Sequence, residues 1–282
     1  EIPDSGFCLR IYIMRNMQIP NTSCPNVRAL VSPEEWELRT NLAACYRLAA
    51  LYGWSDLIFT HISTKLPDDG SGREKFLINP YGVFFDEMKA SDLLVVDAEG
   101  HLQGPVRGHV NRAGFVIHST IHAARPDVNC VLHTHSKAGV AVSAQEDGLL
   151  RVSQQSTLII PTLAYHDYQG VAVHDKERAS LVQDLGQCEY MILRNHGLLT
   201  ASHSIAEAFM AMYLLESACQ IQRVPRQQRH DFFDIAQLTG LAAACEHNSQ
   251  PVIGKPVSER APALSVPHFV IKFRVKMQNR QA

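Results

Sequence analysis

The order of apolar and polar residues predicts helices and strands that follow one another along most of the chain. Helical spacing begins after Ser32 and Pro33, a favourable N-cap and first helical residue, and Gly53 ends that helix. Further helices are expected over 113–124, 139–144, 176–185 and 203–223, and strands over 56–65, 76–79, 93–96, 129–135, 158–160, 171–173 and 190–194. Because strands alternate with helices and no segment is repeated, the sequence predicts a single α/β domain.

The regular pattern covers only the middle of the chain. Residues 1–31 contain a run of proline and short polar residues, and the periodicity weakens again after residue 224, where prolines recur. We therefore expect an irregular N-terminal segment at 1–31, one domain at 32–225 and a C-terminal tail at 226–282.

Composition narrows the class of protein. Hydrophobic residues make up 46% of the chain and charged residues 19%, which is enough apolar material for a substantial core. The net charge of −2 gives no basic field for nucleic acid, and no apolar run reaches the roughly 18 residues of a membrane helix. The seven cysteines are scattered and odd in number, which is typical of free thiols in a reducing compartment. We expect a cytoplasmic protein with no nucleic-acid or membrane partner.

The sharpest chemical signal is the pair His133 and His135 near the end of the strand expected over 129–135. Side chains two residues apart in a strand point to the same face, so the two imidazoles project together. Two imidazoles on one face are half of a zinc site. On this segment alone, two half-buried histidines that hydrogen-bond to the backbone are an equally good interpretation.

A third candidate ligand follows a later strand. His196 comes just after the apolar run 190–194 and directly before Gly197, which permits a tight turn. Ligands often gather beyond strand ends in α/β folds. A turn histidine without a ligand explains this segment as well.

Several ordered motifs over residues 33–223 resemble the class II aldolase/adducin family. They are Leu51-Tyr52-Gly53-Trp54, His61-Ile62-Ser63, Phe76-Leu77-Ile78-Asn79-Pro80-Tyr81-Gly82, Arg125-Pro126-Asp127, His133-Thr134-His135 and Arg194-Asn195-His196-Gly197-Leu198, and the stretch Tyr165-His166-Asp167-Tyr168 resembles the adducin branch.

The resemblance implies a three-layer α/β/α fold, with a central mixed or antiparallel sheet and helices on both faces. It also implies that His133, His135 and His196 bind a divalent metal: zinc, or Mn²⁺, Co²⁺ or Fe²⁺. Three neutral imidazoles leave an open position on zinc, which is typical of a catalytic site. The expected ligand is then a small carbonyl or hydroxy-acid compound, and the expected assembly is a homotetramer.

One position departs from the aldolases of this family. They carry an acid/base glutamate nineteen residues before the first histidine of the H-x-H pair, and here that position is Gly114. Glycine cannot exchange a proton, so the usual retro-aldol mechanism has no acid/base group at this position. The catalytic residues are therefore unknown. His118, His166 and Tyr168 are the candidates, beside the alternative that His118 and the loop residues His166 and Tyr168 only pack.

The residues that resemble the phosphate-binding loop of sugar-phosphate aldolases are altered as well. His61 stands where the sugar-phosphate aldolases have asparagine, Ser63 is kept, and Asn79 replaces the usual threonine before Pro80. With fewer amide and hydroxyl donors, a ligand without phosphate is favoured.

Two functions remain open. The first is a metal-dependent lyase that acts on a small hydroxy-carbonyl compound, and the second is a non-catalytic, adducin-like binding or assembly module. The helix expected over 203–223 bears on assembly, because part of its apolar set could face a neighbouring subunit; the alternative is that all of it packs on its own sheet. That set is Ile205, Ala208, Phe209, Met212, Leu215 and Cys219.

Overall fold

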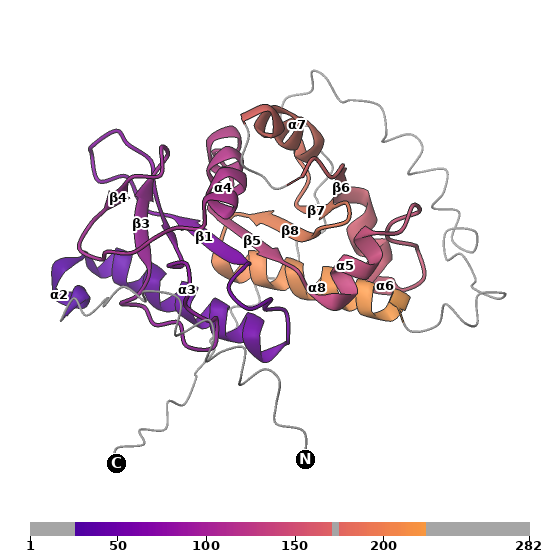
Figure 1. Cartoon of the computed structure of the whole chain (residues 1–282), viewed down its shortest axis with the longest axis horizontal. Helices are drawn as coiled ribbons and strands as arrows, with labels where there is room; N and C mark the ends of the chain where they lie inside the picture. The colour runs from indigo at the N-terminus through magenta and orange to yellow at the C-terminus, as the bar shows by residue number, and fades with distance from the viewer. Residues whose placement is uncertain (1–25, 171–174, 224–282) are drawn as a thin grey trace, which may run out of the picture. The chain divides into compact units, whose positions relative to one another are not determined.

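The computed structural model describes residues 26–170 and 175–223, and these form a mixed sheet with helices on both of its faces (Figure 1). The strands are β1 (His61–Lys65), β2 (Lys75–Ile78), β3 (Leu94–Asp97), β4 (Leu102–Gln103), β5 (Cys130–Thr134), β6 (Leu163–His166), β7 (Tyr190–Leu193) and β8 (Gly197–Ser202). Their order is β4-β3-β2-β1-β5-β8-β7-β6, and every neighbouring pair is antiparallel except β6 with β7. The expected α/β class and mixed sheet are confirmed.

The helices form the two outer layers. They are α2 (Val27–Leu30), α3 (Pro33–Leu51), α4 (Arg112–Ala124), α5 (Lys137–Ser143), α6 (Gln154–Ile159), the 3-10 turn η1 (Ile160–Thr162), α7 (Asp175–Leu185) and α8 (Ile205–Arg223). Helices α3, α5, α6 and α8 lie on one face of the sheet, and α4 and α7 lie on the other (Figure 1). As expected, the Ser32 side chain caps α3 by accepting from the Glu35 N–H.

The alternation of side chains along β5 connects this layering to the site. Cys130 and Leu132 belong to the core under α3 and α8, whereas Val131 belongs to the core under α4 and α7. His133 has the same parity as Val131, so its imidazole projects to the α4 face of the sheet. Thr134 projects to the opposite face and contacts α8.

The strand expected over 158–160 is wrong. Those residues end α6 and enter η1, because Ser153 and Ser156 form a capping box that starts a helix at Gln154. A short apolar run fits a strand or a helix equally well, so periodicity alone could not decide. The strand expected over 171–173 and the segments 1–25 and 226–282 lie outside the described residues.

Three strands were not expected: β4, β6 and β8. β6 contains His166, which was placed in a loop, and β8 begins at Gly197, which was read only as a turn residue. Every residue of β8 is buried between β5 and β7.

Candidate metal centre

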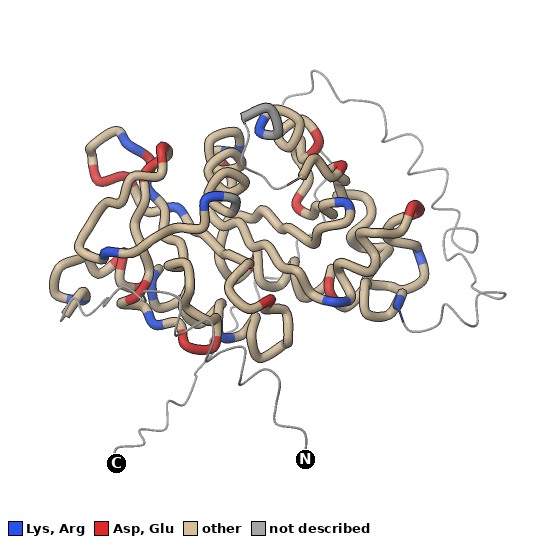
Figure 2. The backbone as a smooth tube through the Cα atoms, in the orientation of Figure 1, with Lys and Arg blue, Asp and Glu red and all other residues tan. Residues whose placement is uncertain are grey.

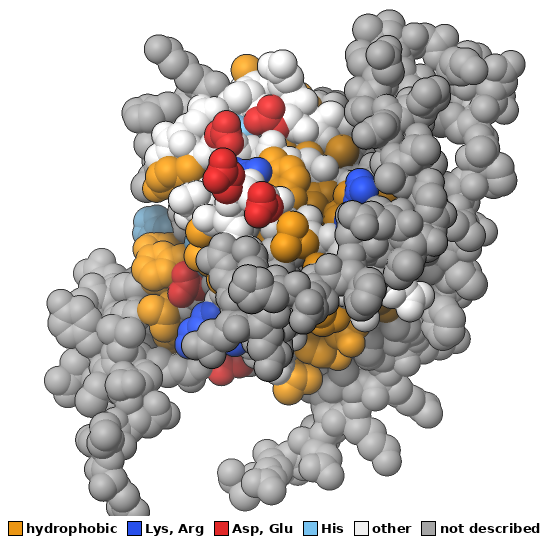
Figure 3. Space-filling model, turned by 90° about the vertical axis from the view of Figure 1, so that its right-hand side faces the viewer, with side chains coloured by type: hydrophobic (Ala, Val, Ile, Leu, Met, Phe, Trp, Pro, Cys, Tyr) orange, Lys and Arg blue, Asp and Glu red, His pale blue; other side chains and the backbone are white. Residues whose placement is uncertain are grey.

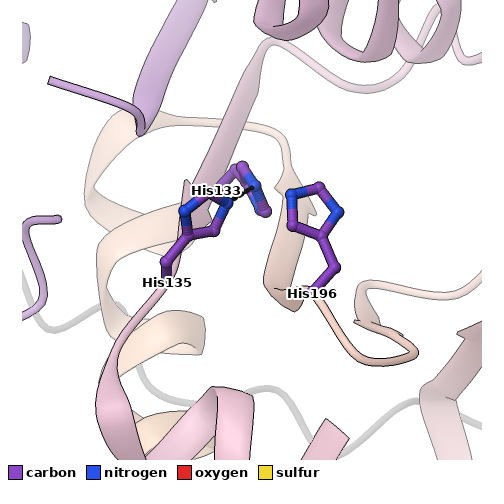
Figure 4. A group of neighbouring side chains, drawn as sticks. All are labelled: His133, His135 and His196. Atoms are coloured by element: carbon purple, nitrogen blue, oxygen red, sulfur yellow. Dashed lines mark hydrogen bonds between the residues drawn. The ribbon is translucent and has the colours of Figure 1, made fainter. Parts of the chain in front are cut away.

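Three histidines converge at the end of β5 and in the turn between β7 and β8 (Figure 4). His133 lies within β5, His135 directly follows that strand, and His196 lies in the β7–β8 turn. One ring nitrogen of each lies within 4.8 Å of one ring nitrogen of the other two. The ring centroids of His196 are 4.8 Å from His133 and 4.7 Å from His135.

The hydrogen bonds of His133 and His135 determine which ring nitrogens are available. His133 Nδ1 lies 2.8 Å from the Leu198 carbonyl oxygen, which can only accept, so Nδ1 carries the proton. His135 Nδ1 lies 3.1 Å from Asp56 Oδ2 and donates to that carboxylate in the same way. The two Nε2 atoms therefore carry lone pairs, and they face each other at 2.8 Å.

Burial makes a proton a poor occupant of this space. Burial and, after it, the neighbouring histidines lower the pKa of His133 well below the ordinary value and the pKa of His196 to about 4. Burial also lowers the pKa of His135, although Asp56 opposes it. Two facing lone pairs in neutral rings repel each other unless a cation lies between them. The donor set thus fits a divalent metal, with Asp56 as the carboxylate that orients one ligand.

The β7–β8 turn can hold His196 only with glycine next to it. Asn195 adopts a left-handed backbone (φ 57°), and its N–H donates to the Ser143 carbonyl at 3.1 Å. A Cβ on Gly197 would lie 2.3 Å from the Thr134 carbonyl oxygen and 3.1 Å from His135 Cδ2. The close approach of β8 to the end of β5 therefore requires glycine at position 197, beside the cluster.

A buried glutamate supports the strand end from behind. Glu216 of α8 accepts from the Thr134 hydroxyl at 3.1 Å and from the Ser136 hydroxyl at 2.6 Å. Thr134 and Ser136 alternate along the chain with His133 and His135, so these bonds hold the backbone that carries both imidazoles. Sequence reasoning missed Glu216 and Asp56, because neither lies near the histidines in the sequence.

His118 belongs to a second polar cluster under α4, which we call the His61 chain: His61, His118, Ser63 and His122. Its links are His61 Nδ1 to His118 Nε2 at 2.8 Å, His118 Nδ1 to Ser63 Oγ at 2.6 Å and Ser63 Oγ to His122 Nε2 at 2.8 Å. Both nitrogens of the His118 ring are thus engaged, and the residue is fully buried. His118 can act on a ligand only through His61.

Gly114 faces the first member of this chain. A Cβ built at position 114 would lie 2.1 Å from His61 Cδ2 and 2.3 Å from His61 Nε2. The imidazole of His61 therefore occupies the space of a side chain at 114. A side chain at position 114 therefore requires the His61 ring to move or to be replaced.

The other two catalytic candidates lie beside His196. His166 ends β6 and donates from Nδ1 to Asp184 Oδ2 at 2.7 Å, and Tyr168 is 57% exposed. Together with His196, Arg194 and Leu193 they line a shallow pocket beside the cluster. The structure thus brings His166 and Tyr168 near the candidate metal centre but leaves His118 behind His61.

Asn79, expected at a loop that would meet a ligand, is instead a core residue. Its Oδ1 accepts from the Tyr46 hydroxyl at 2.9 Å, and its Nδ2 donates to the Thr60 carbonyl at 3.5 Å. The amide is therefore engaged within the protein, in keeping with a ligand that lacks phosphate.

The apolar set of α8 packs on its own chain. All six of its members are buried, with exposures from 0% to 8% (Ile205, Ala208, Phe209, Met212, Leu215 and Cys219). These six residues therefore give no separate support for a subunit interface.

The charged residues of the described chain are not separated by sign. Basic and acidic residues are interspersed over the described part of the chain (Figure 2). Acidic and hydrophobic side chains share the described part of the face seen in Figure 3. Among the described residues, no helix is long and apolar enough to cross a bilayer.

Comparison with known proteins identifies the family. The profile of the Class II Aldolase and Adducin N-terminal domain matches residues 40–223, and the chain belongs to this family. A Pseudomonas aeruginosa protein, assigned by its name to aldolase class 2, is 53% identical over 70% of this chain and 74% of its own length. Rat alpha-adducin is 45% identical over 66% of this chain, which spans only 25% of that adducin.

Solved structures agree with this assignment. An aldolase II superfamily protein from Pseudomonas syringae has a TM-score of 0.72 and 47% identity, over 78% of this chain and 88% of its own. An L-fuculose 1-phosphate aldolase from Glaciozyma antarctica has a TM-score of 0.63 and 31% identity, over 78% and 83% of the two chains. The three-layer fold implied by the sequence motifs is that of these relatives.

Proposed function

We propose that His133, His135 and His196 bind one divalent metal ion, zinc before Mn²⁺, Co²⁺ or Fe²⁺, and that a small hydroxy-carbonyl or hydroxy-acid compound binds there. The observation that carries this proposal is the pair of Nε2 lone pairs that face each other at 2.8 Å with both Nδ1 protons already donated. His196 completes a set of three nitrogens, which leaves a position for a ligand.

A metal bound here would act as a Lewis acid that stabilises negative charge on a carbonyl oxygen. The residues of the chain have separate roles around it. His133, His135 and His196 hold the ion, Asp56 and the Leu198 carbonyl fix two of the rings, and Glu216 fixes the strand end. His166 and Tyr168 line the adjoining pocket, where they can contact a ligand.

The reaction is proposed as a lyase step on a hydroxy-carbonyl compound without phosphate. The Glaciozyma antarctica relative is named for an aldolase reaction on a sugar phosphate. In this chain Gly114 supplies no acid/base group and the Asn79 amide is engaged internally. The engaged amide favours a substrate without phosphate, and the missing carboxylate at 114 requires another group to transfer the proton.

A non-catalytic, adducin-like module is the second candidate, and a specific observation favours it. The imidazole of His61 fills the space of a side chain at position 114. A carboxylate acid/base group therefore has no room at this position while His61 is in place. Metal binding without turnover is the expected result for this alternative. Under either function we propose a cytoplasmic homotetramer.

The test has two steps. Metal analysis of the purified chain should find one zinc per chain, and His133→Ala should lose most of it while the exposed His109→Ala control keeps it. A screen of hydroxyacetone, glycolaldehyde and small hydroxy acids then measures turnover. Turnover supports the lyase; binding without turnover supports the adducin-like module; a chain with no metal contradicts both.

A further inference from the structure

The donor and the acceptor of each hydrogen bond in the His61 chain can be assigned, because the last bond of the series is to a backbone carbonyl. The Val128 carbonyl oxygen can only accept, so His122 Nδ1, at 3.4 Å from it, carries the proton. Burial lowers the pKa of His122 to about 3, and the ring is therefore neutral. A neutral ring protonated on Nδ1 presents a bare Nε2, which accepts from the Ser63 hydroxyl at 2.8 Å.

This assignment fixes the donor and the acceptor of the next two hydrogen bonds. Ser63 already donates its single hydroxyl proton to His122, so its oxygen accepts from His118 Nδ1 at 2.6 Å. The neutral His118 ring is thus bare at Nε2 and accepts from His61 Nδ1 at 2.8 Å. A neutral imidazole has one N–H, and His61 uses it here. The hydrogen bonds of the His61 chain therefore leave a lone pair on His61 Nε2.

The ring that carries this lone pair lies beside the candidate metal centre. His61 and His133 are partners across β1 and β5, both rings project to the α4 face, and their centroids are 5.1 Å apart. His61 Nε2 lies in the space that a side chain at Gly114 would fill. Within the part of the chain that the structure describes, no group forms a hydrogen bond with Nε2.

We propose that His61 Nε2 is a fixed hydrogen-bond acceptor for a ligand at the metal centre, in the place of the side chain that Gly114 lacks. The proposal rests on the proposed function, because the ligand is expected to bind the metal. An acceptor selects a proton donor, so the ligand class is one with a hydroxyl next to its metal-binding oxygen. His118, Ser63 and His122 are positioning residues that hold His61 in this tautomer.

The tautomer can be measured directly by ¹⁵N NMR of histidine-labelled protein, with the His61 signals identified by their loss in His61→Asn. We expect a protonated Nδ1 and a bare Nε2. Ser63→Ala cuts the chain and should produce a mixture of tautomers, whereas Ser119→Ala, on α4 but outside the chain, should change nothing. A protonated Nε2 in the wild type, or an unchanged tautomer in Ser63→Ala, overturns the proposal.

Ligand selection is the second measurement. Glycolate and methoxyacetate offer the zinc-loaded protein similar oxygen atoms, but only glycolate has a hydroxyl proton to donate. The wild type should bind glycolate about threefold to tenfold more tightly, the effect of one hydrogen bond. His61→Phe fills the same space without an acceptor, and there the ratio should fall to about one. Equal affinities in the wild type overturn the proposal.

The shared space of His61 and Gly114 is the third measurement. Gly114→Ala should lower the Tm by several degrees, and by clearly less in a His61→Ala background, where the ring is gone. Additive effects contradict the coupling. The tautomer and Tm measurements need no metal. A protein that binds no metal therefore overturns the proposed function. A protonated His61 Nε2 overturns the role of His61 alone.

Discussion

The buried carboxylate of Glu216 gives a prediction whose size follows from its contacts. Glu216→Ala leaves the Thr134 and Ser136 hydroxyls without their acceptor. Each buried hydroxyl left unpaired costs about 1–3 kcal/mol, and the missing side chain adds a cavity. Met212 Sδ, at 3.6 Å from the Thr134 hydroxyl, recovers only a small part. We expect the free energy of unfolding to fall by about 2–6 kcal/mol.

Urea unfolding measures this loss, and Glu207→Ala is the control, because Glu207 is exposed on the same helix. The control should change the free energy of unfolding by less than about 0.5 kcal/mol. A change of that small size in Glu216→Ala would refute the idea that Glu216 supports the strand end.

The pH dependence gives a second check on Glu216. Burial raises its pKa above the ordinary value, and the hydroxyls of Ser136 and Thr134 oppose this shift. A raised pKa means that the pH-dependent contribution of Glu216 to the free energy of unfolding is complete below the unfolded pKa and is lost as pH rises through the folded pKa. Glu216→Gln cannot titrate. The advantage of wild type over this variant should therefore shrink as pH rises above the ordinary glutamate pKa of 4.5, and a growing advantage would contradict the assignment.

Three further outcomes are expected. Gly197→Ala places a Cβ 2.3 Å from the Thr134 carbonyl, so it should lower the free energy of unfolding by about 1–3 kcal/mol and weaken zinc binding in a metal titration. Unchanged zinc affinity would contradict this. With zinc bound, the chain should cleave L-fuculose 1-phosphate about 10²–10⁴-fold more slowly than an aldolase with a carboxylate acid/base. Equal rates would show that another group supplies the proton transfer. Light scattering should give about four times the chain mass of 31.4 kDa, and a mass near 31.4 kDa would refute the tetramer.

The metal-ligand candidates could be read from the sequence for reasons that the structure explains. A two-residue period puts His133 and His135 on one face of β5, and a glycine after a buried strand marks the turn of His196. Their convergence depends on the pairing of Thr134 with Leu198 between β5 and β8. No local pattern contains that register, so the third ligand came from the resemblance to the family.

The groups around the ligands could not be predicted in this way. Asp56 and Glu216 reach the site from a loop and from α8, through contacts 79 and 82 residues apart in the sequence. The His61 chain requires both the packing of α4 on the sheet and the registry of β1 with β5. The sequence presents Gly114 and His61 as two separate departures from the family pattern and His118 as an unrelated candidate, and the structure shows that His61 contacts His118 and fills the side-chain space at Gly114.

The central claim is that His133, His135 and His196 bind one metal ion, and anomalous diffraction at the zinc absorption edge tests it most directly. A crystal of the purified protein should show one anomalous peak per chain, at about 2.0–2.1 Å from a ring nitrogen of each of the three residues. A crystal grown with zinc that shows no peak among these imidazoles, or a peak bound by other residues, would contradict the account.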